Sequence, residues 1–135
     1  MATGPDEPGQ ANAAPRAGHI RCEHASFALQ SLDGSTVLIA AGEIDIATAP
    51  ALREALLAAA QLSGRVVVDL SAVTFLDSTG LGVLMGSFKH ISAQGSMCLV
   101  GPTGLVAKVL SITRLDEFIP IHTDLDAALI ASHDT

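Results

Sequence analysis

Apolar positions along the chain switch between the spacing of strands and the spacing of helices. The first two apolar segments have the composition of strands, and the Asp33-Gly34 pair between them is typical of a tight hairpin turn. Further along, Arg65-Val-Val-Val-Asp69-Leu70 is a nearly continuous apolar run, which suits a central strand covered on both faces. On this pattern the expected strands are residues 25–32, 36–41, 65–70, 97–100 and 118–121.

Segments with helical spacing connect these strands. Thr48 is a favoured helix N-cap, and Pro50 is tolerated in a first turn because its missing N–H would have no partner there. Gly64 and Gly95 are typical of positions just beyond a helix end. The expected helices run from Thr48 to before Gly64, from about Ser78 to before Gly95, and over residues 105–112 and 124–132. The expected core stripe of the second helix is Leu81, Leu84, Phe88 and Ile91.

The resulting element order, ββαβαβαβα, predicts the α/β class. Strands that are separated by helices of this length imply right-handed crossovers and a mainly parallel sheet with helices packed on it. Residues 1–19 are rich in Pro, Gly, Ala and polar groups without apolar periodicity, so we expect a flexible N-terminal tail. The folded domain is expected to span residues 20–135.

Composition and charge narrow the possible functions. Apolar residues make up 49% of the chain but include only four Phe and no Trp or Tyr, so the core should be aliphatic. A formal net charge of -7 repels nucleic-acid phosphates, which argues against direct DNA or RNA binding. No apolar run is long enough to cross a membrane, and the N-terminus lacks a secretory signal pattern. We therefore expect a cytoplasmic protein.

The most informative segment leads from the central strand into the second helix. It reads Leu70-Ser-Ala-Val-Thr-Phe-Leu-Asp77-Ser78-Thr79-Gly-Leu-Gly82 and places a polar loop at the carboxyl end of a sheet strand. A helix N-terminus at this point offers free N–H groups and the positive end of a dipole, so a hydroxyl there could carry a phosphate. A second interpretation is that Asp77, Ser78 and Thr79 are simply helix caps.

Three segments of the chain resemble the domain that sulphate transporters share with anti-sigma factor antagonists, the STAS domain. The likeness spans roughly residues 23–132 and implies the STAS fold, a mainly parallel sheet with helices packed on it. The segments are Gly42-Glu43-Ile44-Asp45, Val67-Val68-Asp69-Leu70-Ser71 continuing to Phe75-Leu76-Asp77-Ser78-Thr79-Gly80-Leu81-Gly82, and Gly101-Pro102 with Leu110 and Leu115.

Within this family, Asp-Ser-Thr-Gly-Leu-Gly resembles the bacterial antagonists more than the transporter domains. The resemblance implies that Ser78 accepts a phosphate from an anti-sigma factor that is also an ATP-dependent serine kinase, and that a serine phosphatase removes it. The unphosphorylated form would bind the anti-sigma factor and free a sigma factor in stress or developmental transcription. Two other functions stay open: a scaffold in a larger signalling assembly, and a ligand-binding domain of a transport system.

The partner-binding surface is expected around Ser78 and on the outward side of the second helix. Two glycines on that side would cost the helix roughly 1 kcal/mol each unless a partner approaches them closely, although they could also relieve crowding against a loop. The resemblance places the Gly-Glu-Ile-Asp loop nearby, and the protein is expected to be a monomer or weak dimer. The expected partner-binding residues are Glu43, Asp45, Asp77, Thr79, Gly80, Gly82, Val83, Gly86 and His90.

Neither catalysis nor a cofactor is expected. Ser78 lacks a Gly-x-Ser-x-Gly elbow, and His90 lies about 18 Å further along the helix axis, so it cannot act as the serine's base. The histidines show no metal-ligand spacing, and Gly101-Pro-Thr-Gly104 lacks the Gly-Lys ending of a phosphate loop. The two cysteines, one of them Cys22, are expected to be reduced thiols without a function.

Overall fold

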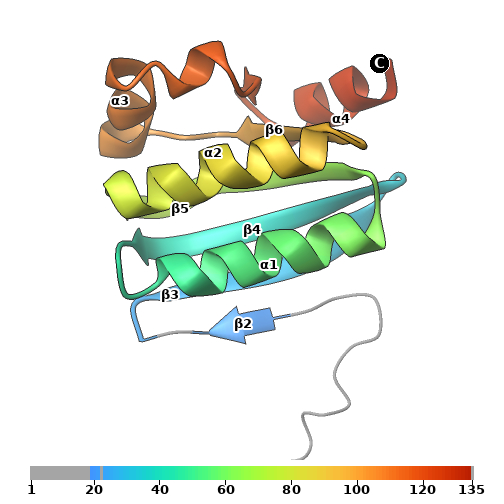
Figure 1. Ribbon diagram of the computed structural model, residues 1–135. Helices are drawn as coiled ribbons and strands as arrows, with labels where there is room; N and C mark the ends of the chain where they lie inside the picture. Colours follow the sequence, from blue (N-terminus) through green and yellow to red (C-terminus); the bar gives the residue numbers. More distant parts are fainter. Residues whose placement is uncertain (1–18, 22, 135) are drawn as a thin grey trace, which may run out of the picture.

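The structure is a computed structural model that describes residues 19–21 and 23–134 (Figure 1). In this part of the chain six strands form one sheet in the order β2-β3-β4-β5-β6-β7. The first two pairs are antiparallel, and the pairs from β4 to β7 are parallel, which confirms the expected α/β class with a mainly parallel sheet. The strands are β2 (His19–Arg21), β3 (Ala25–Leu32), β4 (Ser35–Ile44), β5 (Arg65–Leu76), β6 (Ser96–Val100) and β7 (Ile121–His122).

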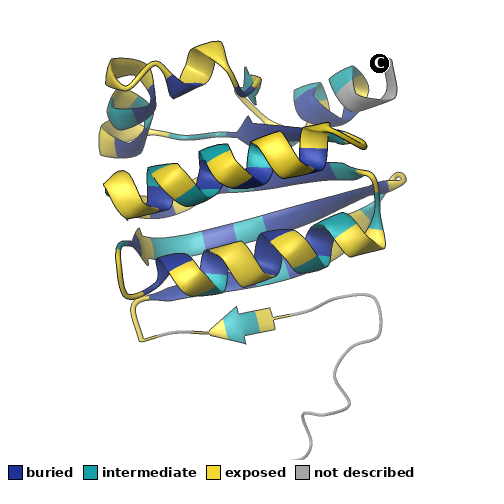
Figure 2. Cartoon of the chain, in the orientation of Figure 1, coloured by how far each residue is buried: buried dark blue, intermediate teal, exposed yellow. Residues whose placement is uncertain are grey.

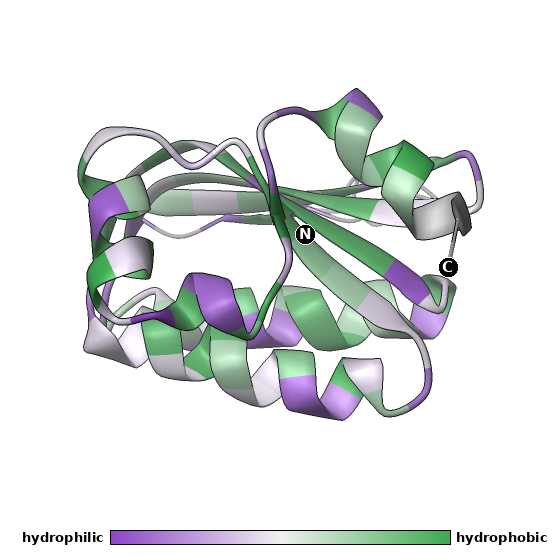
Figure 3. Ribbon diagram, turned by 90° about the horizontal axis from the view of Figure 1, so that it is seen from above, coloured by the Kyte–Doolittle hydropathy of each residue, from purple (hydrophilic) through white to green (hydrophobic). Residues whose placement is uncertain are grey.

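Helices cover both faces of the sheet. The described residues form α1 (Ala49–Leu62), α2 (Ser78–Ser92), α3 (Gly104–Ile112), α4 (Leu125–Asp134) and a 3-10 turn, η2 (Leu115–Glu117). Figure 1 shows α1 and α2 side by side on the near face. Figure 3, seen from above, shows the sheet as a mostly apolar layer between helices. None of these helices combines the length and apolar character needed to span a bilayer.

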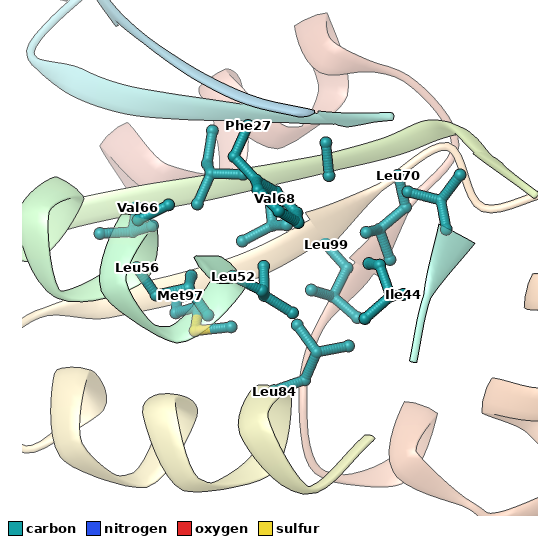
Figure 4. Packing of buried hydrophobic residues seen from close by; sticks show 14 of the residues in the cluster. Phe27, Ile44, Leu52, Leu56, Val66, Val68, Leu70, Leu84, Met97 and Leu99 are labelled. Atoms are coloured by element: carbon teal, nitrogen blue, oxygen red, sulfur yellow. The ribbon is translucent and has the colours of Figure 1, made fainter. Parts of the chain in front are cut away.

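The core is aliphatic apart from Phe27 and lies on both sides of the central strand. Val66 and Val68 of β5 belong to the larger buried cluster with α1, α2 and α3, part of which is drawn in Figure 4. Val67 points the opposite way, into a smaller cluster that Ala128 and Leu129 of α4 complete. Burial on both faces explains the continuous apolar run of β5 and confirms its central position.

The N-terminal boundary needs a correction. His19–Arg21 forms β2, which pairs antiparallel with β3, so one strand precedes the expected order ββαβαβαβα. His19 therefore belongs to the sheet, while residues 1–18 of the expected tail lie outside the described residues, as does Cys22. A strand of three residues with one apolar side chain gives too short an alternation to detect in the sequence.

The last strand lies further along the chain than expected. Arg114 adopts a left-handed conformation with φ of 62°, and η2 follows at once. Phe118, expected to begin a strand, is instead the residue after this turn and is exposed, while Ile119 is buried. The strand itself covers only Ile121–His122.

The buried stripe of α2 is rotated relative to the expected one. Leu84 and Ile91 are buried as predicted, but Leu81 and Phe88 are only half-buried. The remaining buried positions of α2 are Gly80 and Ser87. Because α1 lies alongside, the face of α2 that turns toward α1 is covered as well as the face toward the sheet.

Candidate functional site

The two segments expected to be loops meet at one edge of the sheet, and most of their residues are strand, because β4 continues to Ile44 and β5 to Leu76. Parallel pairing of β4 with β5 sets Glu43 beside Phe75 and Ile44 beside Leu76. The backbone N–H of Asp77 donates to the carbonyl of Ile44 at 3.2 Å, which joins the two segments directly. The ends of these strands therefore form one surface that carries Glu43 and the start of α2.

Asp77 is the N-cap of α2. Its backbone is extended, with φ of -106° and ψ of -173°, and its Oδ1 accepts a hydrogen bond from the Gly80 N–H at 3.1 Å. The Leu81 N–H bonds to the Asp77 carbonyl at 3.0 Å. The capping interpretation is therefore correct for Asp77. Ser78 and Thr79, in contrast, occupy the first two helical positions, where N–H groups have no acceptor within the helix.

Both hydroxyl side chains at the helix start are exposed to solvent, but they differ in position. Thr79 lines a groove between α1 and α2, and Ser78 does not. Adjacent helical residues differ by about 100° in direction, which accounts for the difference. A group that approaches one hydroxyl along its O–H direction would therefore not reach the other from the same direction.

Gly80 is buried beneath this loop. A Cβ atom at this position would lie 2.6 Å from both Ile44 Cγ2 and Leu76 Cδ1. The absence of a side chain lets the start of α2 pack directly on the ends of β4 and β5. The structure thus gives Gly80 a packing role below the surface on which partner contacts were expected.

The loop between β4 and α1 is fixed by its own side chains. Asp45 Oδ1 accepts hydrogen bonds from the N–H groups of Ala47 at 2.9 Å and Thr48 at 3.1 Å. The Thr48 hydroxyl donates to the Glu43 carbonyl at 2.8 Å and accepts from the Asp45 N–H at 2.9 Å. Thr48 occupies the N-cap position as predicted, but its buried hydroxyl bonds backward into the loop and does not cap α1. Glu43 remains exposed, whereas Asp45 is half-buried.

The outward side of α2 forms one wall of the groove, which has a volume of about 440 Å³. Gly82, Gly86 and His90 are exposed and Val83 is half-buried, and Figure 2 shows exposed residues along the outer faces of both helices. A Cβ atom at Gly82 or Gly86 would meet nothing within 4 Å. Relief of crowding therefore does not explain these two glycines.

Sequence reasoning missed the wall that α1 contributes. Arg53 and Leu57 line the groove from α1, and Ser87 lines it from α2. The first two are four residues apart and follow directly after the core positions Leu52 and Leu56, so helical spacing places them on a shared face. Their meeting with α2 depends on how the helices pack, which the pattern of a single helix does not contain.

Among the described residues, the possible metal ligands are not grouped and the one cysteine is buried. Among residues 19–21 and 23–134 no three His, Cys, Asp or Glu side chains are grouped so that they could hold a metal ion. Cys98 is buried in β6, and burial raises the pKa of its thiol to about 11, so it is neutral at physiological pH.

Comparisons with known proteins agree with this architecture. Residues 26–128 match the STAS domain family. The anti-sigma-B factor antagonist of Bacillus subtilis (strain 168) is 40% identical over 82 residues, which are 60% of this chain and 75% of that protein. The crystal structure of an anti-sigma factor antagonist from Mycobacterium paratuberculosis is 33% identical with a TM-score of 0.73, over 90% of this chain and 98% of the other.

A more distant structure has the same fold. The unphosphorylated form of the anti-sigma factor antagonist SpoIIAA is 23% identical with a TM-score of 0.62, over 75% of this chain and 91% of the other. The family match covers most of the described residues, and the likeness to the Mycobacterium paratuberculosis structure covers 90% of this chain. The chain therefore belongs to the STAS domain family.

Proposed function

We propose that this chain is an anti-sigma factor antagonist, a cytoplasmic protein-binding switch without catalytic activity of its own. Its unphosphorylated form binds an anti-sigma factor serine kinase, and phosphorylation of Ser78 releases that partner until a serine phosphatase restores the hydroxyl. Relatives named anti-sigma-B factor antagonist support the role. The observation that carries the switch is the exposed Ser78 hydroxyl at the first position of a capped helix.

The start of α2 can accept a phosphate without rearrangement. A phosphoserine carries a charge of about -1.5 to -2 at neutral pH. The N–H groups of Ser78 and Thr79 have no intrahelical acceptor, and the positive end of the helix dipole lies at the same place. Asp77 remains engaged with the Gly80 N–H, so the cap can persist beside the new charge. The modification therefore changes the surface and leaves the fold intact.

Release follows from the cost of covering that charge. At a protein contact the phosphate must lose water, and a like charge about 4 Å away would cost several kcal/mol at an effective dielectric constant near 20. Glu43 and Asp45 already make this edge of the sheet acidic, so the partner must tolerate negative charge before phosphorylation. A phosphate dianion at Ser78 would add more negative charge than the partner surface can accommodate, so the complex would dissociate.

The test begins with a pull-down of the partner from the native cytoplasm by the unmodified protein. Incubation of the identified kinase with ATP should place one phosphate on the wild type and on Thr79→Val, and none on Ser78→Ala. Mass spectrometry of peptides that contain both positions locates the phosphate. Efficient modification of Ser78→Ala at Thr79 would show that the acceptor is assigned to the wrong hydroxyl.

A further inference from the structure

The groove between α1 and α2 is unusual in its charge. The chain carries fourteen Asp and Glu against seven Lys and Arg. The described residues that line the groove nevertheless include Arg53 and His90 but no carboxylate. The exposed guanidinium of Arg53 is therefore a local positive site on an acidic protein, and it would attract a negative group.

The Ser87 hydroxyl adds a second polar feature to the same groove. Ser87 lines it and is only 8% exposed. None of the hydrogen bonds between described side chains and the backbone or other side chains involves its hydroxyl. Among the described residues, the fully buried hydroxyls without a partner are those of Ser35 and Thr36, so the Ser87 hydroxyl is open to the groove and can donate to a bound acceptor.

Apart from Thr79, the rest of the lining is apolar and includes two glycines. Leu57 is 40% exposed on the α1 side, and Val83 is half-buried on the α2 side. Gly82 and Gly86 leave open space where side chains would stand. A volume of about 440 Å³ is enough for a few side chains of a docked segment, and the two glycines let its backbone come close.

We infer that this groove docks an acidic, partly apolar segment of the anti-sigma factor, which presents a carboxylate to Arg53 and an acceptor to the Ser87 hydroxyl. The apolar side of that segment covers Leu57 and the two glycines. This inference rests on the proposed function and adds α1 to the partner surface. Thr79 lines the groove next to Ser78 in sequence, so an acidic segment lying there would also be repelled by a phosphate on Ser78.

The experiment uses the anti-sigma factor that the pull-down has identified. The purified factor is titrated by calorimetry with the wild-type protein and with each variant. Arg53→Glu should weaken binding at least tenfold at low salt, Arg53→Gln should weaken it less, and Ser87→Ala should weaken it a few fold. Lys108→Glu makes the same charge change on an exposed residue of α3 outside the groove, and it should alter the affinity less than twofold.

A charge exchange then locates the contact. Reversing one carboxylate of the anti-sigma factor to Lys should restore binding to Arg53→Glu and weaken binding to the wild type. Equal losses for Arg53→Glu and Lys108→Glu, or wild-type affinity for Arg53→Glu, would overturn the docking site. So would a change in self-association, measured by sedimentation, with unchanged anti-sigma binding.

Failure of the groove is distinguishable from failure of the proposed function. If Arg53→Glu binds normally and phosphorylation of Ser78 still releases the partner, the phosphorylation switch is correct and docking in the groove is wrong. If the wild type binds no anti-sigma factor, both are wrong. Thermal melting of each variant verifies the fold. Substitution of Arg53 should not change the melting temperature, because this side chain is exposed.

Discussion

The three glycines of α2 have different physical roles. Gly80 is buried, and a Cβ there would press on Ile44 and Leu76, whereas Gly82 and Gly86 face open space. We predict that Gly82→Ala and Gly86→Ala each raise the free energy of unfolding by roughly 0.5–1 kcal/mol, because alanine is the better helix former. Urea denaturation measures the change.

Gly80→Ala should have the opposite sign. Overpacking beneath the loop should lower the free energy of unfolding by about 1–3 kcal/mol in the same assay. Equal stabilisation by all three alanine substitutions would contradict the close packing of α2 on the ends of β4 and β5. A natural protein that keeps two helix-weakening glycines on an open surface is consistent with binding that requires close approach.

Cys98 gives a prediction about pH. Burial raises the pKa of its thiol from 9.0 to about 11, so the folded state disfavours the thiolate. The associated stability is fully present below pH 9 and is lost as the pH rises toward 11. In a Cys22→Ser variant, iodoacetamide at pH 8 should modify the native protein at least a hundredfold more slowly than the urea-unfolded protein. Similar rates would show that the thiol is accessible.

At single residues the sequence indicated the polar types but not their partners. Asp77 was open to both a capping and a functional interpretation; its bond to the Gly80 N–H shows that it caps α2, and its contact with a partner stays a prediction. Thr48 has the right type and position for a cap, yet its hydroxyl bonds to the Glu43 carbonyl. Such choices depend on which acceptor lies within about 3 Å, and that is set by the path of the loop.

Helix α2 is the element on which partner binding should depend most. We predict that Gly86→Gln abolishes anti-sigma binding, because its side chain would fill the groove that Gly86 leaves open. The circular dichroism spectrum should stay unchanged, since the new Cβ would meet no described atom within 4 Å outside its own stretch of helix. Ser92→Gln, on an exposed residue of α2 outside the groove, is the matched control. Undiminished binding by Gly86→Gln would remove this face from the interface.

The elements that could be predicted from the sequence are those with strong internal periodicity. The helical repeats of α1 and α2 gave the right type at nearly the right bounds. The continuous apolar run of β5 gave the right type, but the strand extends beyond the expected end at Leu70 to Leu76. Where packing between elements sets the buried face or the bounds of an element, the hydrophobic pattern was insufficient. The stripe of α2 is rotated toward α1, β2 is only three residues long, and η2 moves the last strand to Ile121–His122.

At the scale of the whole molecule, phosphorylation should act without a change of fold. We predict that phospho-Ser78 binds the anti-sigma factor at least a hundredfold more weakly than the unmodified protein, a difference of about 2.8 kcal/mol. Ser78→Asp should copy this only partly, because it carries one charge instead of nearly two. Calorimetric titration gives the affinities.

Amide NMR spectra of both forms test whether the effect is local. Shifts should be confined to the start of α2, the neighbouring end of β4 and the groove. Equal affinities of the phosphorylated and unmodified proteins for the anti-sigma factor would contradict the phosphorylation switch. Shifts spread over the distant β2–β3 edge, accompanied by unequal affinities, would keep the switch and replace the local mechanism by a conformational one.

The turn between β3 and β4 also bears on how the chain reaches its native state. Asp33 and Gly34 have φ values of 54° and 81°, and Leu32 pairs with Ser35 across them, as in a type I′ hairpin. This hairpin closes a short loop, whereas the parallel pairing of β4 with β5 must wait for the whole of α1 to be enclosed. The antiparallel edge should therefore nucleate folding, and Gly34→Ala should slow refolding in stopped-flow experiments while leaving the unfolding rate nearly unchanged. Faster unfolding at an unaltered refolding rate would instead place the formation of this turn after the rate-limiting barrier.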